Sequence, residues 1–458
     1  MEANIALQNF PKHPDFLDIR RFLKEGFESR HNCIKDIVIE VSDILAFTRT
    51  GKIYQKVYPW LDETLYSRTP ALIREVNKSF GAGNCEVKQV SFRIRTAQVA
   101  KTAENQDVGP LGVFATRDIE KGEALMVDKC ITGISNVPSS RLLHCDACHA
   151  SLRAPYIHPT RVIKPSCCGK VAFCSHACHD VASKGYHTVV CGKDTDWLYE
   201  HSQSSSSQRD DRVSWRPILF LRLMCIVLSD RCSQHTAARK PTHPLQHPLI
   251  IRLAANYAPN HKRHPDICSD WQYFENVVAP HRILELLGVN IFSDPDFAPE
   301  VIQTIYWRIE NNASMATVNL SPSGPGHKKS QSLDTRTGDR KDAVNMMCLN
   351  PNYIFFNHSC EPNVSWHGAT PDPWVGIYSL RGLNKEILRP GCSAVWCNAS
   401  RDVKKGEELK ISYVGDPMGD GKGERESKRT WMRKWFDGGC GCRICLSEDE
   451  NEIKRGVD

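Results

Sequence analysis

Cysteine and histidine residues are concentrated between Cys145 and Cys191, with spacing suited to metal binding. The best-defined parts are a Cys-x2-Cys pair at Cys145, a Cys-x3-Cys pair at Cys174 and a His-x3-Cys pair ending at Cys191. Zinc takes four thiolate or imidazole ligands, and two ligands a few residues apart can bind one ion from a single turn. Seven or eight candidate ligands within fewer than fifty residues predict two zinc ions. Each structural zinc contributes roughly 10–16 kcal/mol of folding free energy. So dense a cluster disfavours the alternative, buried free cysteines.

Three later segments contain residue types that bind ligands or metals. Residues 356–363 read Phe-Asn-His-Ser-Cys-Glu-Pro-Asn, residues 406–413 read Gly-Glu-Glu-Leu-Lys-Ile-Ser-Tyr, and a Cys-x-Cys-x2-Cys motif occupies 440–445. Alone, the octapeptide could be a loop with side-chain caps. A disulfide or redox pair is the alternative for the last motif, and a reducing compartment disfavours it. The three segments together favour a functional centre.

In this combination the segments resemble the SET methyltransferases, and the cysteine-rich stretch between 145 and 191 resembles a MYND zinc finger. The chain is therefore similar to the SET-and-MYND group of protein lysine methyltransferases, over roughly residues 85–446 and with the motifs in family order. The resemblance implies an α+β fold of small curved sheets, in which the Asn-His-Ser-Cys and Tyr segments form a pseudoknot. It also implies methyl transfer from S-adenosylmethionine to a lysine of a histone or another protein.

The resemblance assigns roles to individual residues. Tyr413 matches the catalytic tyrosine at the junction of the cofactor and the lysine channel. Gly112 follows a glycine turn in which Gly109 stands one place early and Pro110 occupies the expected glycine position. The residues that match cofactor-binding positions are Asn357, His358, Asn312, Gly112 and Phe436. Candidates for the walls of an aromatic channel are Tyr353, Phe355, Phe356 and Trp396, although buried aromatic residues more often belong to a core.

The same resemblance implies three zinc sites. The family has a further cysteine where this chain has Pro165, so Cys167 is the substitute candidate for the fourth ligand of the second ion. His144, His149, His176 and His179 are competing ligands without the family spacing. The implied sets are Cys145, Cys148, Cys174 and Cys178 for the first ion, Cys167, Cys168, His187 and Cys191 for the second, and Cys360, Cys440, Cys442 and Cys445 for the third.

Hydrophobic periodicity and composition predict the elements around these motifs. Strand patterns occur at 86–95, 113–115 and 124–127, and helices are predicted at 215–228, 300–311 and near 424–435. The predicted segments are a helical N-terminal part at 1–83, SET parts at 84–144 and 301–417, a MYND finger at 145–191, a linker and helical insertion at 192–300 and a C-terminal zinc segment at 418–458. Polar stretches at 202–212 and 321–343 predict a linker and a disordered loop.

The composition bounds the class of protein. The chain has 458 residues and a formal net charge of +6, which is small for this length. The first thirty residues lack an apolar secretory core, and the apolar run at 218–228 is interrupted by Arg222 and too short to span a bilayer. We therefore expect an intracellular protein of the nucleus, the cytoplasm or both, without membrane partners. The rival prediction is a non-enzymatic adaptor whose finger binds proline-rich peptides. Direct nucleic-acid binding is disfavoured because no basic stripe with aromatic residues accompanies the finger.

Overall fold

The computed structural model describes most of the chain from residue 61 onward. The described residues are 61–78, 80, 83–90, 111–130, 132–153, 157–204, 212–236, 241–254, 274–291, 293–319, 343–368, 394–415, 422–432 and 440–447. The predictions for 1–60, 91–95 and the loop at 321–342, and those for Gly109 and Phe436, lie outside these residues.

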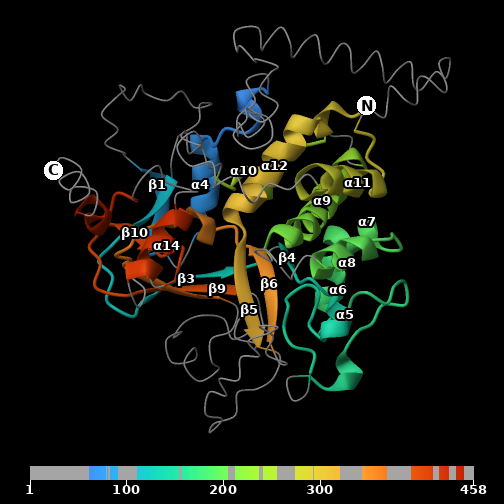
Figure 1. Ribbon diagram of the computed structural model, residues 1–458, viewed down its shortest axis with the longest axis horizontal. Helices are drawn as coiled ribbons and strands as arrows, with labels where there is room; N and C mark the ends of the chain where they lie inside the picture. Colours follow the sequence, from blue (N-terminus) through green and yellow to red (C-terminus); the bar gives the residue numbers. More distant parts are fainter. Residues whose placement is uncertain are drawn as a thin grey trace.

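Three small sheets form one side of the molecule (Figure 1). The first has the order β1 (Cys85–Gln89), β2 (Leu111–Ala115), β10 (Glu408–Ile411) and β7 (Asn357–His358). The second has the order β3 (Ala124–Lys129), β9 (Ala394–Ala399) and β8 (Val364–Gly368). The third has the order β4 (Thr132–Ile134), β6 (Ala343–Leu349) and β5 (Ser314–Asn319). The strands predicted near 86, 113 and 124 are confirmed, and the first of these begins at Cys85.

Most of the helices lie on the other side of the molecule (Figure 1). The predicted apolar helix is α9 (Arg212–Thr236), and the one predicted at 300–311 is α12 (Pro299–Asn312). Proline at the first position of α12 fits its fixed φ, and the buried residues of this helix recur at three- and four-residue spacing. The other helices are α4 (Pro70–Lys78), α5 (Ser139–Leu142), α6 (His176–Ala182), α7 (Thr188–Val190), α8 (Asp196–Ser204), α10 (Pro248–Ile251), α11 (Ala279–Leu286) and α14 (Lys422–Met432).

Both predicted polar stretches have different boundaries in the structure. The linker predicted from Ser202 begins later, because α8 continues to Ser204. Ala343, the last residue of the predicted loop, already pairs with Asn319 in the β5–β6 hairpin. In both places, regular backbone hydrogen bonding extends into a sequence whose composition is typical of loops.

The core is divided into two clusters. One lies among the β1 and β3 sheets and includes Val113, Leu125, Phe356 and Leu409. The other joins the segment at 145–191 (hereafter the finger segment) to α9, α11 and α12, and reaches the third sheet at Met347. The finger segment therefore shares its hydrophobic core mainly with the helical insertion.

Candidate functional site

The segments that carry the sequence motifs lie side by side at β7 and β10. These two strands pair in parallel, with Asn357 opposite Lys410 and His358 opposite Ile411. The Ser359 N–H donates to the Ile411 carbonyl at 2.8 Å, which extends the pairing by one residue. The chain then turns so that Tyr413 lies beside His358, with ring centroids 5.3 Å apart. Two motifs about fifty residues apart in sequence thus form one unit.

Tyr413 is held at both its ends by the Phe356–His358 segment. Its backbone N–H donates to His358 Nδ1 at 3.0 Å, and its hydroxyl donates to the Phe356 carbonyl at 2.8 Å. Burial raises the pKa of the Tyr413 phenol, and the nearby Glu408 carboxylate raises it further. The hydroxyl therefore stays protonated at neutral pH, so it acts as an oriented hydrogen-bond donor and not as a base.

The same contacts define the state of His358. Its side chain is buried, and burial lowers its pKa to about 4, so the ring is neutral at pH 7. Because Nδ1 accepts the Tyr413 N–H, the proton of the neutral ring is on Nε2. Nε2 lies 3.5 Å from Cys360 Sγ. The histidine therefore connects the tyrosine to a cysteine of the third predicted zinc site.

Asn357 is fixed by a carboxylate that the sequence analysis left without a role. Its Nδ2 donates to Glu408 Oε1 at 2.8 Å and to the Leu111 carbonyl at 3.0 Å. The glycine at position 112 leaves room for the side chains of Asn357 and Glu408 to meet. A Cβ atom at position 112 would lie 2.7 Å from Glu408 Oε1 and 2.9 Å from Asn357 Nδ2. The structure thus brings Gly112, Asn357, His358 and Tyr413 into one network.

Two further side chains to which the sequence gave no role, Asn363 of the octapeptide and Asp128, support this network. Asn363 donates to the Glu408 carbonyl at 2.9 Å and accepts the Lys410 N–H at 2.7 Å, so it fastens the octapeptide to β10. Asp128 accepts the N–H groups of Asn352 and Tyr353 at 2.8 and 2.7 Å, in the turn before Asn357. Burial raises the pKa of Asp128 to about 6, against the lowering effect of these hydrogen bonds. The partners in each of these contacts are far apart in sequence, so the spacing of residues could not predict either contact.

The remaining predicted cofactor and channel residues have other surroundings. The Asn312 side chain, at the end of α12, bonds to both the N–H and the carbonyl of Ala254 and to the Arg308 carbonyl. Its assignment as a cofactor ligand stays a prediction, and these contacts give it a structural role. The aromatic side chains proposed for the channel walls are at least 92% buried, as expected of core residues, and they are Tyr353, Phe355, Phe356 and Trp396.

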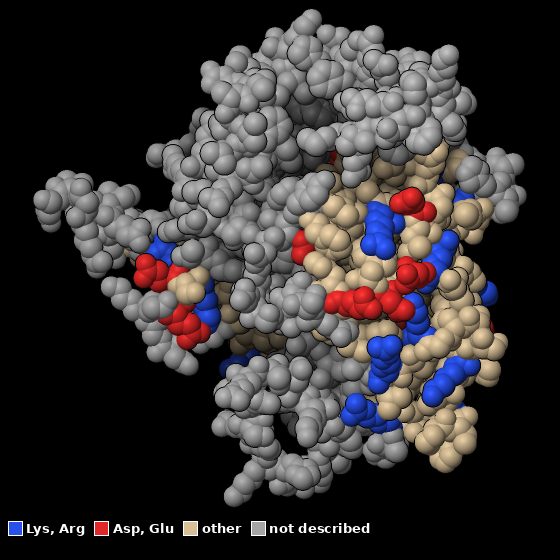
Figure 2. All heavy atoms as spheres, turned by 45° about the vertical axis from the view of Figure 1, so that its right-hand side comes forward, with Lys and Arg blue, Asp and Glu red and all other residues tan. Residues whose placement is uncertain are grey.

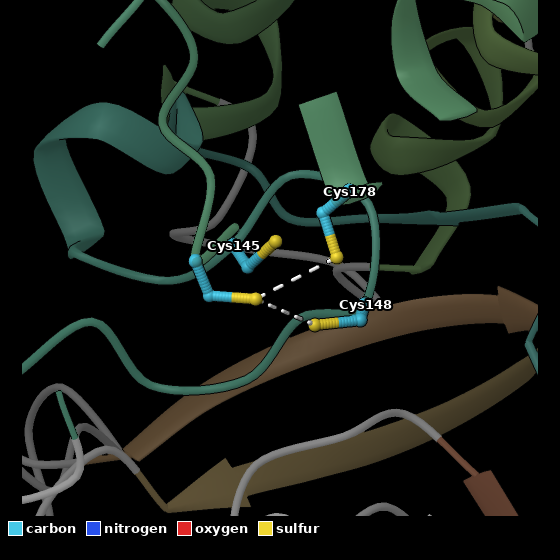
Figure 3. A group of neighbouring side chains, drawn as sticks. Cys145, Cys148 and Cys178 are labelled. Atoms are coloured by element: carbon cyan, nitrogen blue, oxygen red, sulfur yellow. Dashed lines mark hydrogen bonds between the residues drawn. The ribbon is translucent and has the colours of Figure 1, made fainter. Parts of the chain in front are cut away.

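Cluster I consists of Cys145, Cys148, Cys174 and Cys178, whose sulfur atoms all lie within 4.8 Å of one another. The Cys174 sulfur is 3.6 Å from that of Cys148 and 3.5 Å from that of Cys178. Four sulfurs at 2.3 Å from one zinc are about 3.8 Å apart in a tetrahedron, so the spacing fits. Figure 3 shows the sulfurs of Cys145, Cys148 and Cys178 turned toward one another. Ser175 helps to place Cys178, because its side chain caps α6 by accepting the Cys178 N–H.

Cluster II consists of Cys167, Cys168, His187 and Cys191, whose ligand atoms also lie within 4.8 Å of one another. His187 Nε2 is 3.3 Å from Cys167 Sγ and 3.9 Å from Cys168 Sγ. These distances bracket the value of about 3.6 Å for a nitrogen and a sulfur on one tetrahedral zinc. The adjacent cysteines thus both face the same point. The competing histidines His144 and His149 contact Ser135 and the Gly133 carbonyl instead.

Cluster III consists of Cys360, Cys440, Cys442 and Cys445. The three sulfur–sulfur separations among Cys360, Cys440 and Cys445 are 3.7–3.9 Å, close to the tetrahedral value. Gly441, with φ of +75°, supplies the turn that lets both neighbouring cysteines face the cluster. Hydrogen bonds from Cys360 and Cys440 hold the pKa of Cys445 well below its usual range. That thiol therefore favours the ionised form that binds zinc.

The sequence model of the SET domain matches residues 110–414, which include β2 through Tyr413. The chain belongs to the SET-domain family. Members of this family are typically protein lysine methyltransferases, and the network around Tyr413 lies inside the matched residues. A comparison with curated proteins found no match.

The charge of the surface and the hydropathy of the helices are the two remaining features of the described residues. Lys and Arg side chains occur beside Asp and Glu side chains on the described face in Figure 2. Among the described residues, no helix is both long enough and apolar enough to cross a membrane.

Proposed function

We propose that this protein is a zinc-containing, S-adenosylmethionine-dependent methyltransferase that modifies a lysine of a histone or of another protein. The observation that carries the proposal is the pair of hydrogen bonds that Tyr413 donates to His358 and to Phe356 inside a SET domain. When bound, S-adenosylmethionine supplies a methyl group on a positively charged sulfur. Clusters I and II support a MYND-type finger, for which a proline-rich peptide is the proposed partner. Residence in the nucleus, the cytoplasm or both stays a prediction.

The chemistry requires a neutral lysine amine in line with the methyl group. A free lysine has a pKa near 10.4, so deprotonation at pH 7 costs about 4.6 kcal/mol. Exclusion of water from the site lowers this cost because the charged ammonium loses its hydration. Tyr413 cannot take the proton, since its own pKa is raised. Its role is to orient the amine through the phenol oxygen, which has acceptor capacity left after donating to Phe356.

Titration calorimetry of the purified, zinc-loaded protein tests the proposal. We expect S-adenosylmethionine to bind in the micromolar range, and metal analysis to find three zinc ions per chain. Asn357→Ala should weaken cofactor binding at least tenfold, because it removes the side chain fixed between Leu111 and Glu408. Asn290→Ala is the matched control, since Asn290 is exposed in the loop after α11. A folded protein with all its zinc but no affinity for the cofactor would favour the adaptor instead.

Gly112→Ala tests the close approach beneath Asn357. The new methyl group must separate Glu408 Oε1 from Asn357 Nδ2, because both atoms lie within 3.0 Å of it. We expect a loss of about 1–3 kcal/mol of stability, as for other overpacked sites, together with weaker cofactor binding. Gly185→Ala is the control, since its Cβ would meet no other atom within 4 Å. Wild-type affinity in Gly112→Ala would remove this position from the cofactor site.

A further inference from the structure

Arg425, on α14, directs its guanidinium group at the sulfur atoms of cluster III. One terminal nitrogen donates to Cys360 Sγ at 3.1 Å, and the other lies 3.7 Å from Cys445 Sγ. The side chain is buried, with 9% of the residue exposed. It lines a small pocket together with His358, Cys360, Cys440 and Cys445. The Arg425 cation is thus buried against the sulfurs of two candidate metal ligands.

The charge of the loaded cluster explains why an arginine suits this place. A zinc ion with four thiolates carries a net charge of −2, and a buried charge is costly unless it is compensated. Arginine stays protonated under all ordinary conditions, and its planar fork can donate to two acceptors at once. Hydrogen bonds to zinc-bound thiolates therefore offset part of the negative charge. They also tie α14 to the metal ligands.

Cys360 connects this arginine to the catalytic region. Its sulfur receives the Arg425 N–H from one side and lies 3.5 Å from His358 Nε2 on the other. The opposite nitrogen of the same ring accepts the Tyr413 N–H. The Cys360 sulfur thus lies between the Arg425 guanidinium and the His358 ring. Groups that hydrogen-bond to metal ligands commonly change metal affinity or activity about 10- to 100-fold when they are removed.

We propose that Arg425 is a positioning residue that donates to the Cys360 and Cys445 thiolates, retains the metal of cluster III and, through Cys360, orients His358 for the cofactor. Arg425→Met keeps the length of the side chain and removes the donors. Arg425→Lys keeps the charge but not the fork. Arg443→Met is the matched control, because Arg443 lies in the same cysteine segment but is 86% exposed and pairs with Glu361.

Zinc release to a chromogenic chelator is the first measurement. The kinetic phase that is missing in Cys442→Ser belongs to cluster III. That phase should be about 10- to 100-fold faster in Arg425→Met, intermediate in Arg425→Lys and unchanged in Arg443→Met. In cobalt-substituted protein, the thiolate-to-metal absorption band should shift in Arg425→Met and not in Arg443→Met. Wild-type release and an unshifted band in Arg425→Met would overturn the proposal. If Arg425→Met does not fold, wild-type release from Arg425→Lys would overturn the requirement for the fork.

The cofactor measurement is separate from the metal measurements. It rests on the proposed function, and we expect a higher KM for S-adenosylmethionine in Arg425→Met with a smaller change in kcat. The release rate and the cobalt band need neither cofactor nor substrate. A chain that binds no S-adenosylmethionine but shows the faster release would therefore refute the proposed function and keep the role of Arg425.

Discussion

Tyr413→Phe should slow methyl transfer about 100- to 1,000-fold while changing the affinity for S-adenosylmethionine less than about threefold. The magnitude is that of removing one oriented hydrogen-bonding group from a catalytic site. The substitution leaves the ring packed beside His358 and the backbone N–H bonded to Nδ1. It removes only the hydroxyl that donates to the Phe356 carbonyl. Single-turnover transfer of a labelled methyl group to protein substrate, with calorimetry for the cofactor, measures the two quantities separately.

Tyr306→Phe is the matched control for this experiment. Tyr306 is fully buried in α12, and its hydroxyl has no hydrogen-bond partner among the described residues. Loss of an unpaired buried hydroxyl should leave methyl transfer unchanged and should not lower stability. Full activity in Tyr413→Phe would exclude the assigned role of its hydroxyl. Equal loss in both variants would indicate a general sensitivity of the core.

The adjacency of Tyr413 and His358, which are 55 residues apart, was implied by the resemblance to the SET family and not by spacing. The cysteines of cluster I differ in this respect, because their pairs are separated by two or three residues and need only one turn to face a common point. Short-range spacing carries this information directly. Cys167 was only a substitute candidate, because Pro165 stands at the family's cysteine position and four histidines competed with it; the structure places it with Cys168, His187 and Cys191.

Contacts made across long stretches of sequence could not be predicted in this way. Asp128 reaches the N–H of Tyr353 across 225 residues, and Arg425 reaches Cys360 across 65. An aspartate in a strand or an arginine in a charged helix has many ordinary explanations, and spacing does not choose among them. Glu408 lay inside a recognised motif, but only the packing of Gly112 against it shows that it fixes Asn357.

Asn312 shows a case in which one residue type fits two roles. An asparagine at the end of a helix can satisfy backbone groups left free by the helix terminus. Its three backbone contacts here are instead to Ala254, beyond the end of α10, and to the Arg308 carbonyl inside α12. A resemblance based on one residue cannot separate this structural role from a cofactor contact, because both need the same amide.

Arg222 breaks the apolar run of α9, and the structure gives the physical reason. It forms two hydrogen bonds with the Asp146 carboxylate, at 2.9 and 3.0 Å. Tyr186 donates to the same carboxylate at 2.9 Å, and its ring lies 3.8 Å from the guanidinium carbon. Burial acts to raise the pKa of Asp146, but Arg222 lowers it well below its usual range. Because Asp146 lies between two ligands of cluster I, this pair joins the finger segment to the helical insertion.

Arg222→Met should therefore lower the free energy of unfolding by about 3–5 kcal/mol, because it leaves the Asp146 charge buried without its partner. Chemical denaturation of the zinc-loaded protein, followed by tryptophan fluorescence, measures the change. Lys404→Met is the control: it breaks the Lys404–Asp118 ion pair, whose side chains are 80% and 63% exposed, and should leave the free energy of unfolding nearly unchanged. In the double variant Arg222→Met/Asp146→Asn, the loss should be smaller than the sum of the two single losses, since no buried charge remains. Equal, small losses in Arg222→Met and Lys404→Met would mean that the finger segment is held to α9 by apolar packing alone.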